Sequence, residues 1–259
     1  MSMFDLSGRV AVITGGNGGI GLGIAQALAL SGCNVAIWGR NADKNRAAAA
    51  SMARGPGEDD TRVCDVTAPL SVADAMKATL DVFGRVDGCF AYAGIGGGGR
   101  KPFIERTEAE WRNMFATNLD GAFHVFQVVA RHMIERAQDG DAFGRLVATS
   151  SLASLFGTAR NEHYAATKAA LNALCRALAV ELARYGVTAN AILPGWIKSD
   201  MTARAMADDK FVNAVMPRIP LRRFGEPSDF GGIAVYLMSK ASSYHTADCF
   251  VIDGGYTAF

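Results

Sequence analysis

The sequence has no excess of charge of either sign, because 25 aspartates and glutamates balance its 26 lysines and arginines. It also lacks a run of the roughly 18 apolar residues that a membrane span requires, and its first ten residues hold no apolar segment typical of an export signal. Balanced charge argues against an electrostatic nucleic-acid binder. We therefore expect a cytoplasmic protein with a small-molecule substrate, and neither a nucleic-acid nor a membrane partner.

Closely spaced metal ligands are missing as well. The five cysteines include no CxxC pair, and the four histidines are equally scattered. An odd number of dispersed cysteines is typical of buried thiols in a reducing compartment. We expect no metal in the chemistry.

Short β-branched runs alternate with longer segments of helical period, which is the pattern of βα units that build a parallel sheet. We predict strands at residues 10–14, 34–38, 62–65, 87–92, 145–150, 187–193 and 248–252. We predict helices at residues 19–30, 42–54, 70–83, 108–137, 162–184 and 228–239. No repeat or break in composition marks a boundary. The expectation is one α/β domain over residues 1–259, a doubly wound Rossmann-type fold whose seven-stranded parallel sheet has helices on both faces.

The segment from Thr14 to Gly21, TGGNGGIG, joins the first predicted strand directly to the first helix. Glycines allow a tight turn and let a pyrophosphate approach the amides of a helix N-terminus, where the helix dipole favours negative charge. Such a turn alone is a weak signal, but the strand before it and the helix after it strengthen the interpretation. We predict dinucleotide contacts from Gly15, Asn17, Gly19, Ile20 and Gly21.

No carboxylate stands at the end of the second predicted strand, where an acid would accept hydrogen bonds from the adenosine ribose. Gly39 and Arg40 stand there instead. A guanidinium fork suits a 2′-phosphate and favours NADP(H). If Arg40 stacks on adenine or faces water, NAD(H) remains the alternative. Asp65 and Val66 end the third predicted strand, where the carboxylate either accepts a hydrogen bond from the adenine amino group or caps the next helix.

Tyr164 and Lys168 lie four residues apart and therefore share one helix face. A free tyrosine titrates at about pH 10, too high for efficient proton transfer near neutrality. A cation about 4 Å away in a half-wet cleft is worth roughly 4 kcal/mol, or about three pK units. We therefore predict that Lys168 brings the phenol into working range. Ser151, after the fifth strand, is either a turn residue or a hydrogen-bond donor to the substrate oxygen.

Together these motifs resemble the short-chain dehydrogenase/reductase family over essentially the whole chain, and its 3-oxoacyl-reductase-like and alcohol dehydrogenase-like members in particular. The glycine-rich segment resembles TGxxxGxG, PGWIKSDM from Pro194 to Met201 resembles PGxxxT, and IDGG at 252–255 resembles the closing VDGG. Ser151 precedes Tyr164 by 13 residues, the family's usual distance. The family's catalytic tetrad is matched by Asn118, Ser151, Tyr164 and Lys168.

The resemblance implies that hydride passes between the nicotinamide and a carbonyl or alcohol carbon while Tyr164 gives or takes the proton. Lys168 would also bind the nicotinamide ribose, Ser151 would orient the substrate oxygen, and Asn118 would hold a relay water. Further cofactor contacts are implied for Tyr164, Pro194, Ile197 and Ser199. A substrate lid at about residues 198–225 and a homotetramer through the long helices and the last strand are also implied.

The chain departs from the family at the end of the fourth strand, where Ala91-Tyr92-Ala93-Gly94 replaces the usual NNAG. Ala91 can act beside the cofactor ribose only through its backbone, and Tyr92 is expected to pack in place of the second asparagine. We still expect Ala91 and Gly94 at the cofactor. The following glycine run, residues 96–99, with Arg100 and Lys101, is either a rim that admits an anionic substrate or a loop with no role.

The leading hypothesis is an oxidoreductase that uses NADP(H) on a carbonyl/secondary alcohol pair. One alternative is an NAD(H)-dependent dehydrogenase of the same family, and another is a cofactor-binding regulator without catalysis. The intact tetrad argues against the regulator. The sequence leaves the substrate and the direction of reaction open.

Overall fold

The computed structural model describes residues 3–52, 56–96 and 101–259. Seven parallel strands form one sheet in the order β3-β2-β1-β4-β5-β6-β7. The strand order reverses between β1 and β4, the position at which doubly wound sheets bind ligands. The strands are β1 Val10–Thr14, β2 Asn34–Gly39, β3 Asp59–Val63, β4 Gly88–Ala91, β5 Gly144–Thr149, β6 Val187–Pro194 and β7 Cys249–Ile252.

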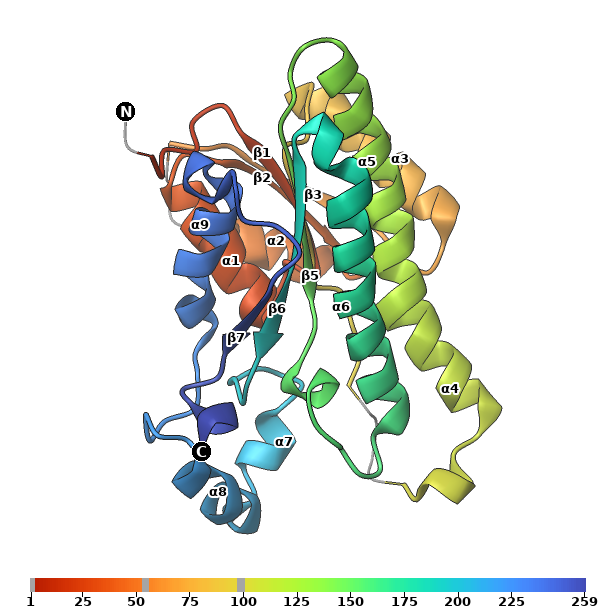
Figure 1. The fold of residues 1–259 in the computed structure, drawn as a ribbon, viewed down its shortest axis with the longest axis vertical. Coiled ribbons are helices and arrows are strands. Elements are labelled where there is room, and N and C mark those ends of the chain that lie inside the picture. Colours follow the sequence, from red (N-terminus) through yellow and green to blue (C-terminus); the bar gives the residue numbers. More distant parts are fainter. Residues whose placement is uncertain (1–2, 53–55, 97–100) are drawn as a thin grey trace.

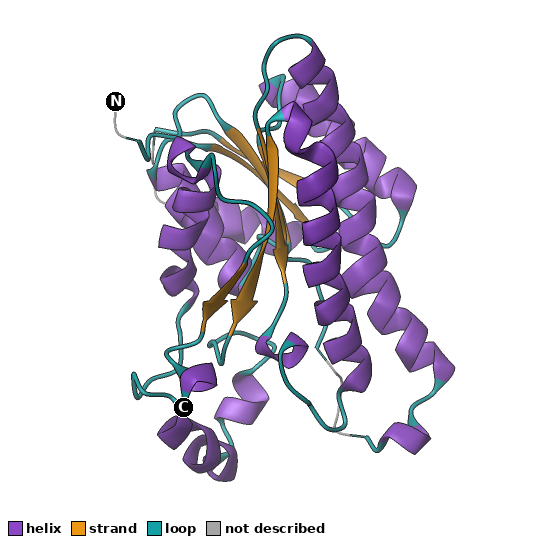
Figure 2. Cartoon of the chain, in the orientation of Figure 1, coloured by secondary structure: helices purple, strands orange, loops and turns teal. Residues whose placement is uncertain are grey.

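Helices cover both faces of the sheet (Figures 1 and 2). One face carries α1 Gly19–Leu30, α2 Ala42–Ser51 and α9 Gly231–Met238, and the other carries α3 Pro69–Phe83, α5 Gly121–Gln138 and α6 Glu162–Leu182. Two further helices, α7 Ala203–Met206 and α8 Asp209–Val215, lie beyond the carboxyl ends of β6 and β7. The predicted fold class is confirmed.

Alternation along the strands explains the two layers. Val12 and Trp38 belong to one buried apolar cluster, whereas the neighbouring Ile13 and Ile37 belong to the other. Successive side chains of a strand point to opposite faces, and both faces here are covered. The central strands therefore appear in the sequence as continuous apolar runs.

The third predicted strand is misplaced, because β3 spans Asp59–Val63 rather than residues 62–65. Among the described residues this strand pairs only with β2, from Val35 opposite Asp59 to Gly39 opposite Val63. Its side chains are exposed or half-buried, so the strand lacks the apolar run on which the prediction relied. Asp65 consequently lies beyond the end of β3.

Three predicted helices also differ from the structure. The helix predicted over residues 108–137 consists of α4, Glu108–Phe115, a π-helical turn, Ala116–Asp120, and α5. The helix predicted to residue 54 ends at Ser51, because Met52 is extended. The last predicted helix begins as a 3₁₀ turn, Pro227–Phe230, before α9.

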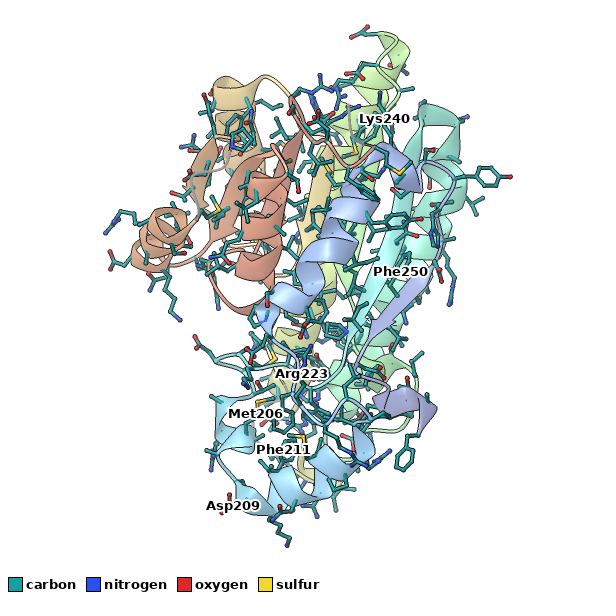
Figure 3. All side chains as sticks on the ribbon, turned by 90° about the vertical axis from the view of Figure 1, so that its left-hand side faces the viewer. Met206, Asp209, Phe211, Arg223, Lys240 and Phe250 are labelled. Carbon is teal, nitrogen blue, oxygen red and sulfur yellow. The ribbon has the colours of Figure 1, made fainter. Side chains whose placement is uncertain are left out.

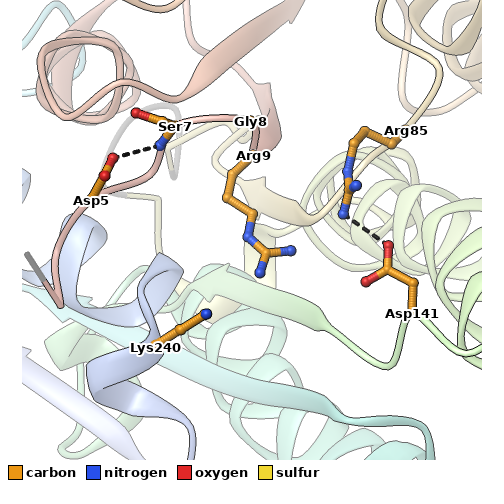
Figure 4. Close-up of a pocket in the computed structure, with 7 residues that line it drawn as sticks. All are labelled: Asp5, Ser7, Gly8, Arg9, Arg85, Asp141 and Lys240. Carbon is orange, nitrogen blue, oxygen red and sulfur yellow. Dashed lines mark hydrogen bonds and ion pairs between the residues drawn. The ribbon is translucent and has the colours of Figure 1, made fainter. Parts of the chain in front are cut away.

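A buried ion cluster ties the sheet together at its amino-terminal edge. Asp87 has no exposed side-chain surface and accepts hydrogen bonds from Arg9 at 3.0 Å, Arg85 at 2.6 Å and Arg136 at 3.0 Å. Burial alone would raise the pKa of Asp87, but the hydrogen bond from Arg85 and the charge of Arg136 outweigh it, so this pKa is lowered. A polar cavity of about 410 Å³ lies beside the cluster, lined by Arg9, Arg85, Asp141 and Lys240 among others (Figure 4).

This cavity is remote from the expected ligand site. Figure 3 shows Lys240 at one end of the molecule and Met206 and Phe211, from the α7–α8 segment, at the other. Ligands of doubly wound sheets bind at the carboxyl ends of the strands. We therefore interpret the amino-terminal cluster as structural.

Candidate functional site

Two positions of the glycine-rich turn, Gly15 and Gly21, leave no room for a side chain. Gly15 has φ +68°, and a Cβ at this position would lie 2.9 Å from the backbone nitrogen of Ala93. A Cβ on Gly21 would lie 2.5 Å from the carbonyl oxygen of Gly15. The hydroxyl of Thr14 accepts hydrogen bonds from the N–H groups of Tyr92 and Ala93, both at 3.1 Å. The turn therefore packs directly on the chain that leaves β4.

The start of α1 offers its amides to an anion. Its N-cap residue is Gly18, no side chain of the described residues caps it, and its first turn contains no acidic residue. Uncapped N–H groups and the helix dipole favour a phosphate at such an end. Together with the close glycine backbone, these features fit the pyrophosphate of a dinucleotide, and the contacts from Gly15, Asn17, Gly19, Ile20 and Gly21 stay a prediction.

At the end of β2, Arg40 is exposed and, within the described part of the chain, makes no hydrogen bond or ion pair. Its charge also contributes to the lowered pKa of Asp65, after hydrogen bonds from the backbone and hydroxyl of Thr67. The Asp65 carboxylate accepts those two bonds at 2.9 and 2.8 Å. These bonds close a turn before α3 and do not cap that helix, because its N-cap residue is Ala68 and no side chain of the described residues caps it. Val66 is buried, and its carbonyl bonds Nδ1 of His124 at 2.9 Å.

Asn118 lies in the π-helical turn and is 1% exposed. Its Oδ1 accepts a hydrogen bond from the N–H of Ile95 at 2.8 Å, and its Nδ2 donates to the carbonyl of Ile95 at 3.0 Å. Gly94 comes directly before Ile95, and a Cβ on Gly94 would lie 3.2 Å from Asn118 Oδ1 and 3.7 Å from Lys168 Nζ. Asn118 and Lys168 therefore meet at Gly94, in front of β4.

Lys168 is buried, and its Nζ donates a hydrogen bond to the carbonyl of Thr149 at 2.8 Å. Sequence analysis missed this carbonyl and also Ser150, whose hydroxyl donates to the carbonyl of Lys168 at 2.8 Å. The hydroxyl run at the end of β5, residues 149–151, was the available signal. Both bonds fix α6 against the end of β5, so the predicted lysine and the strand end are brought together.

The predicted lowering of the Tyr164 pKa by Lys168 is not observed, because this pKa is raised. Lys168 Nζ lies 5.5 Å from the centre of the Tyr164 ring and is directed to Thr149. Burial raises the pKa of Tyr164, and a hydrogen bond with Ser151 partly opposes that rise. Ser151 otherwise accepts a bond from the N–H of Ala153 at 3.2 Å. The Ser151 hydroxyl therefore opposes the effect of burial without overcoming it, and the pKa of Tyr164 stays above its ordinary value.

Burial of Lys168 lowers its pKa from the ordinary 10.5 to about 8. Between pH 8 and 10.5 the unfolded chain then binds more protons at this residue than the folded chain, so the contribution of Lys168 to stability rises with pH. We predict that the melting temperature of the wild type rises relative to Lys168→Met across this window, as measured by circular dichroism. A difference that stays constant with pH would contradict the lowered pKa.

The segment after β6 closes the site on its other side. A Cβ on Gly19 would lie 3.4 Å from Cβ of Ser199, which places Ser199 against the glycine-rich turn. Thr202, which sequence analysis did not single out, bonds the backbone N–H of Ser199 at 3.1 Å and the carbonyl of Ile197 at 2.5 Å. Ile197 also pairs with Gly225, so the two ends of the 198–225 segment meet.

Other predicted positions have structural partners. Pro194 ends β6 and pairs with Ile252 of β7. Ala91 ends β4 opposite Thr14 and is buried. Tyr92, which stands where the family has its second asparagine, packs against the apolar cluster under α1. Gly97 to Arg100 of the predicted rim lie outside the described residues, while Lys101 is bonded to Glu110.

No three histidine, cysteine, aspartate or glutamate side chains of residues 3–52, 56–96 and 101–259 are grouped so as to hold a metal ion. Within the same ranges, no helix combines the length and apolarity of a membrane span.

Known proteins match this chain over nearly its whole length. The family model described as enoyl-(acyl carrier protein) reductase matches residues 15–257. Gluconate 5-dehydrogenase of Gluconobacter oxydans is 34% identical over 255 residues, covering 98% of this chain and 97% of the relative.

Two solved structures match equally well. A short-chain type dehydrogenase/reductase from Mycobacterium marinum is 33% identical with a TM-score of 0.91, covering 99% of this chain and 98% of that chain. A protein assigned as an NAD(P)-dependent gluconate 5-dehydrogenase from Beutenbergia cavernae, with NADP bound at low occupancy, is 35% identical with a TM-score of 0.91 over the whole of both chains. The chain therefore belongs to the short-chain dehydrogenase/reductase family of NAD(P)-dependent oxidoreductases that act on CH–OH and carbonyl groups.

Proposed function

We propose that the protein interconverts a carbonyl compound and a secondary alcohol with NADP(H), using Tyr164 as the general acid and base. The observation that carries this proposal is the meeting of Asn118, Lys168 and Gly94 in front of β4, beside the strand-order reversal. The glycine-rich turn lies next to Ser199 at the same end of the sheet. When bound, the cofactor would give the hydride in reduction and accept it in oxidation.

The protein's own side chains would transfer the proton and position the substrate and cofactor. The Tyr164 hydroxyl would donate its proton to the forming alkoxide in reduction, and the Tyr164 phenolate would take the proton of the substrate alcohol in oxidation. Ser151 orients the substrate oxygen, and Lys168 binds the nicotinamide ribose. Asn118 holds the loop after β4 through Ile95 and supports a water in the relay. The 198–225 segment, joined at its ends by Ile197 and Gly225, serves as the substrate lid.

A substrate screen tests the activity and its main alternative. Purified protein is offered ketones and alcohols with NADPH/NADP⁺ and with NADH/NAD⁺. The panel includes 5-ketogluconate and 3-oxoacyl thioesters, because the relative from Gluconobacter oxydans is named for gluconate and the family model for acyl carrier protein. Turnover of any compound in the panel supports the proposed oxidoreductase activity. Cofactor binding without turnover across the panel would favour the regulator instead.

The preference for NADP(H) rests on Arg40. Its guanidinium is exposed and, among the described residues, unpaired, so it is available to a 2′-phosphate. The NADP bound in the Beutenbergia cavernae neighbour supports the same cofactor.

We predict that Arg40→Asp lowers NADPH affinity by about tenfold to a hundredfold, because one charge-assisted bidentate contact is lost and a carboxylate repels the phosphate. NADH affinity should hold or rise. Fluorescence titration of both cofactors measures the change, with Arg112→Asp, on exposed α4, as a control that should leave both affinities alone. An unchanged NADPH/NADH ratio in Arg40→Asp would remove the 2′-phosphate assignment.

We also propose a cytoplasmic homotetramer. Phe123 on α5, Val180 on α6 and Val251 on β7 are 47%, 81% and 39% exposed, and apolar exposure of this kind is typical of contact surfaces. Light scattering coupled to size exclusion measures the mass in solution, and any mass other than that of four subunits would contradict the tetramer.

A further inference from the structure

A buried amide, Asn45 of α2, joins the three segments around the expected adenosine site. Asn45 is 2% exposed. Its Oδ1 accepts a hydrogen bond from Asn17 Nδ2 at 2.6 Å, which ties it to the glycine-rich turn. Its Nδ2 donates to the carbonyl of Gly39 and to the carbonyl of Arg62, both at 2.9 Å. The amide oxygen and nitrogen are both engaged, so Asn45 cannot turn away without leaving buried polar groups unpaired.

The Asn17–Asn45 pair fills the space in front of Gly39. A Cβ on Gly39 would lie 2.5 Å from Asn45 Oδ1 and still closer to Asn17 Nδ2. Those distances are well inside ordinary van der Waals contact, and Asn45 is held in place by three bonds. A larger residue at position 39 must therefore break the link between the glycine-rich turn and the end of β2.

Position 39 is the last residue of β2, where a carboxylate would read the two ribose hydroxyls of NAD(H). We propose that Asn45 is a specificity-determining residue: with Asn17 it occupies the volume that an acidic side chain at position 39 needs. The pair thereby excludes the carboxylate-based recognition of NAD(H) and leaves Arg40 as the first side chain beyond the sheet. This inference rests on the proposed NADP(H)-dependent function and adds a second residue to its cofactor selection.

The test is a double-mutant cycle between positions 39 and 45, read by cofactor binding rather than by turnover. Gly39→Ala should weaken NADPH binding by about tenfold, because overpacking at this point displaces the glycine-rich turn. Asn45→Ser shortens the side chain and releases Asn17 from its bond to Asn45 Oδ1, so that both side chains can move away from the new Cβ. In the Gly39→Ala chain it should therefore restore most of the lost affinity. Gly232→Ala is the matched control, since a Cβ there meets no atom within 4 Å. It should bind NADPH as the wild type does.

The same cycle with aspartate in place of alanine at position 39 tests the choice between NADPH and NADH. Gly39→Asp alone should bind both NADPH and NADH more weakly than the wild type. Adding Asn45→Ser should improve NADH binding by about tenfold over Gly39→Asp alone and make NADH the preferred cofactor. Calorimetry with 2′-AMP and 5′-AMP gives the same comparison without the nicotinamide. Circular dichroism confirms that each variant is folded, and if Gly39→Asp is not, the alanine cycle decides.

The outcomes separate this inference from the proposed function. Additive effects at positions 39 and 45, or tighter NADH binding by Gly39→Asp without any change at Asn45, would overturn the role of Asn45. A wild-type chain that binds NADH as tightly as NADPH would instead overturn the proposed cofactor preference, and this is measured before any variant. Non-additive effects of the substitutions at positions 39 and 45, in a protein that binds NADPH more tightly than NADH, support both the role of Asn45 and the proposed cofactor preference.

Discussion

Tyr164→Phe is expected to bind NADPH like the wild type and to lose turnover by about 10²–10⁴-fold, the usual contribution of a general acid. The substitution removes only the hydroxyl, while the ring keeps its place 5.5 Å from Lys168 Nζ. Because the Lys168 ammonium bonds the Thr149 carbonyl, its position does not depend on the phenol. Steady-state rates on any substrate found in the screen, with fluorescence titration of NADPH, measure both effects.

The matched control is Tyr244→Phe, which removes the hydroxyl of a fully exposed tyrosine and should change neither rate nor binding. A Tyr164→Phe enzyme that kept half of its turnover would eliminate Tyr164 as the proton donor. Equal loss of NADPH binding and turnover would mean that the hydroxyl serves to bind the cofactor rather than to transfer a proton.

Asp87→Asn is expected to lower the free energy of unfolding by about 3 kcal/mol, because removing one member of a buried charge cluster leaves the others uncompensated. Arg9, Arg85 and Arg136 would then share the cluster with Asp141 alone. We place the effect at the lower end of the usual range because these arginines keep 12–33% of their side-chain surface in water. Urea denaturation followed by fluorescence measures it.

The pH dependence of this loss has a defined sign. The pKa of Asp87 is lowered in the folded protein, so its stabilisation is complete above the unfolded pKa of about 4 and is lost as pH falls through the folded pKa. The difference in the free energy of unfolding between wild type and Asp87→Asn should therefore be constant from pH 5 to 7, because both limits lie about one unit or more above the unfolded pKa. This difference should narrow below about pH 4. Asp81→Asn, in an exposed pair with Lys77, is the control and should cost less than about 0.5 kcal/mol. A comparable loss in both variants would contradict the special role of burial.

Sequence patterns predicted the elements that have one unambiguous physical cause. The central strands are apolar because both faces are covered, and β1, β2 and β6 lie within one residue of their predicted bounds. The glycine-rich turn was readable because Gly15 and Gly21 face backbone atoms that admit no side chain. The edge strand β3 was misplaced because exposed Asp59 and half-buried Asp60 carry no such pattern.

The parts of the site that sequence did not predict depend on contacts between distant segments. The bond between Lys168 and the Thr149 carbonyl involves a backbone group, which no side-chain pattern reveals. The engagement of Asn45 with Asn17, Gly39 and Arg62 likewise joins three separate stretches of chain. A sequence shows that these residues exist but not that they share one point in space.

The π-helical turn at Ala116–Asp120 has a consequence for how this helix can change. A π turn amounts to one residue inserted into an α-helix, and each residue of an α-helix turns the chain by about 100°. Deleting one residue here would restore regular α geometry but rotate α5 relative to α4 by that angle. Either Asn118 would leave Ile95, or the buried stripe of Val125, Val129 and Met133 would turn away from the sheet. The π turn thus lets one continuous helix place Asn118 at Ile95 and also direct the apolar face of α5 at the sheet. A regular α-helix of this sequence could not do both, so we expect neither a deletion nor a regular helix to be tolerated here.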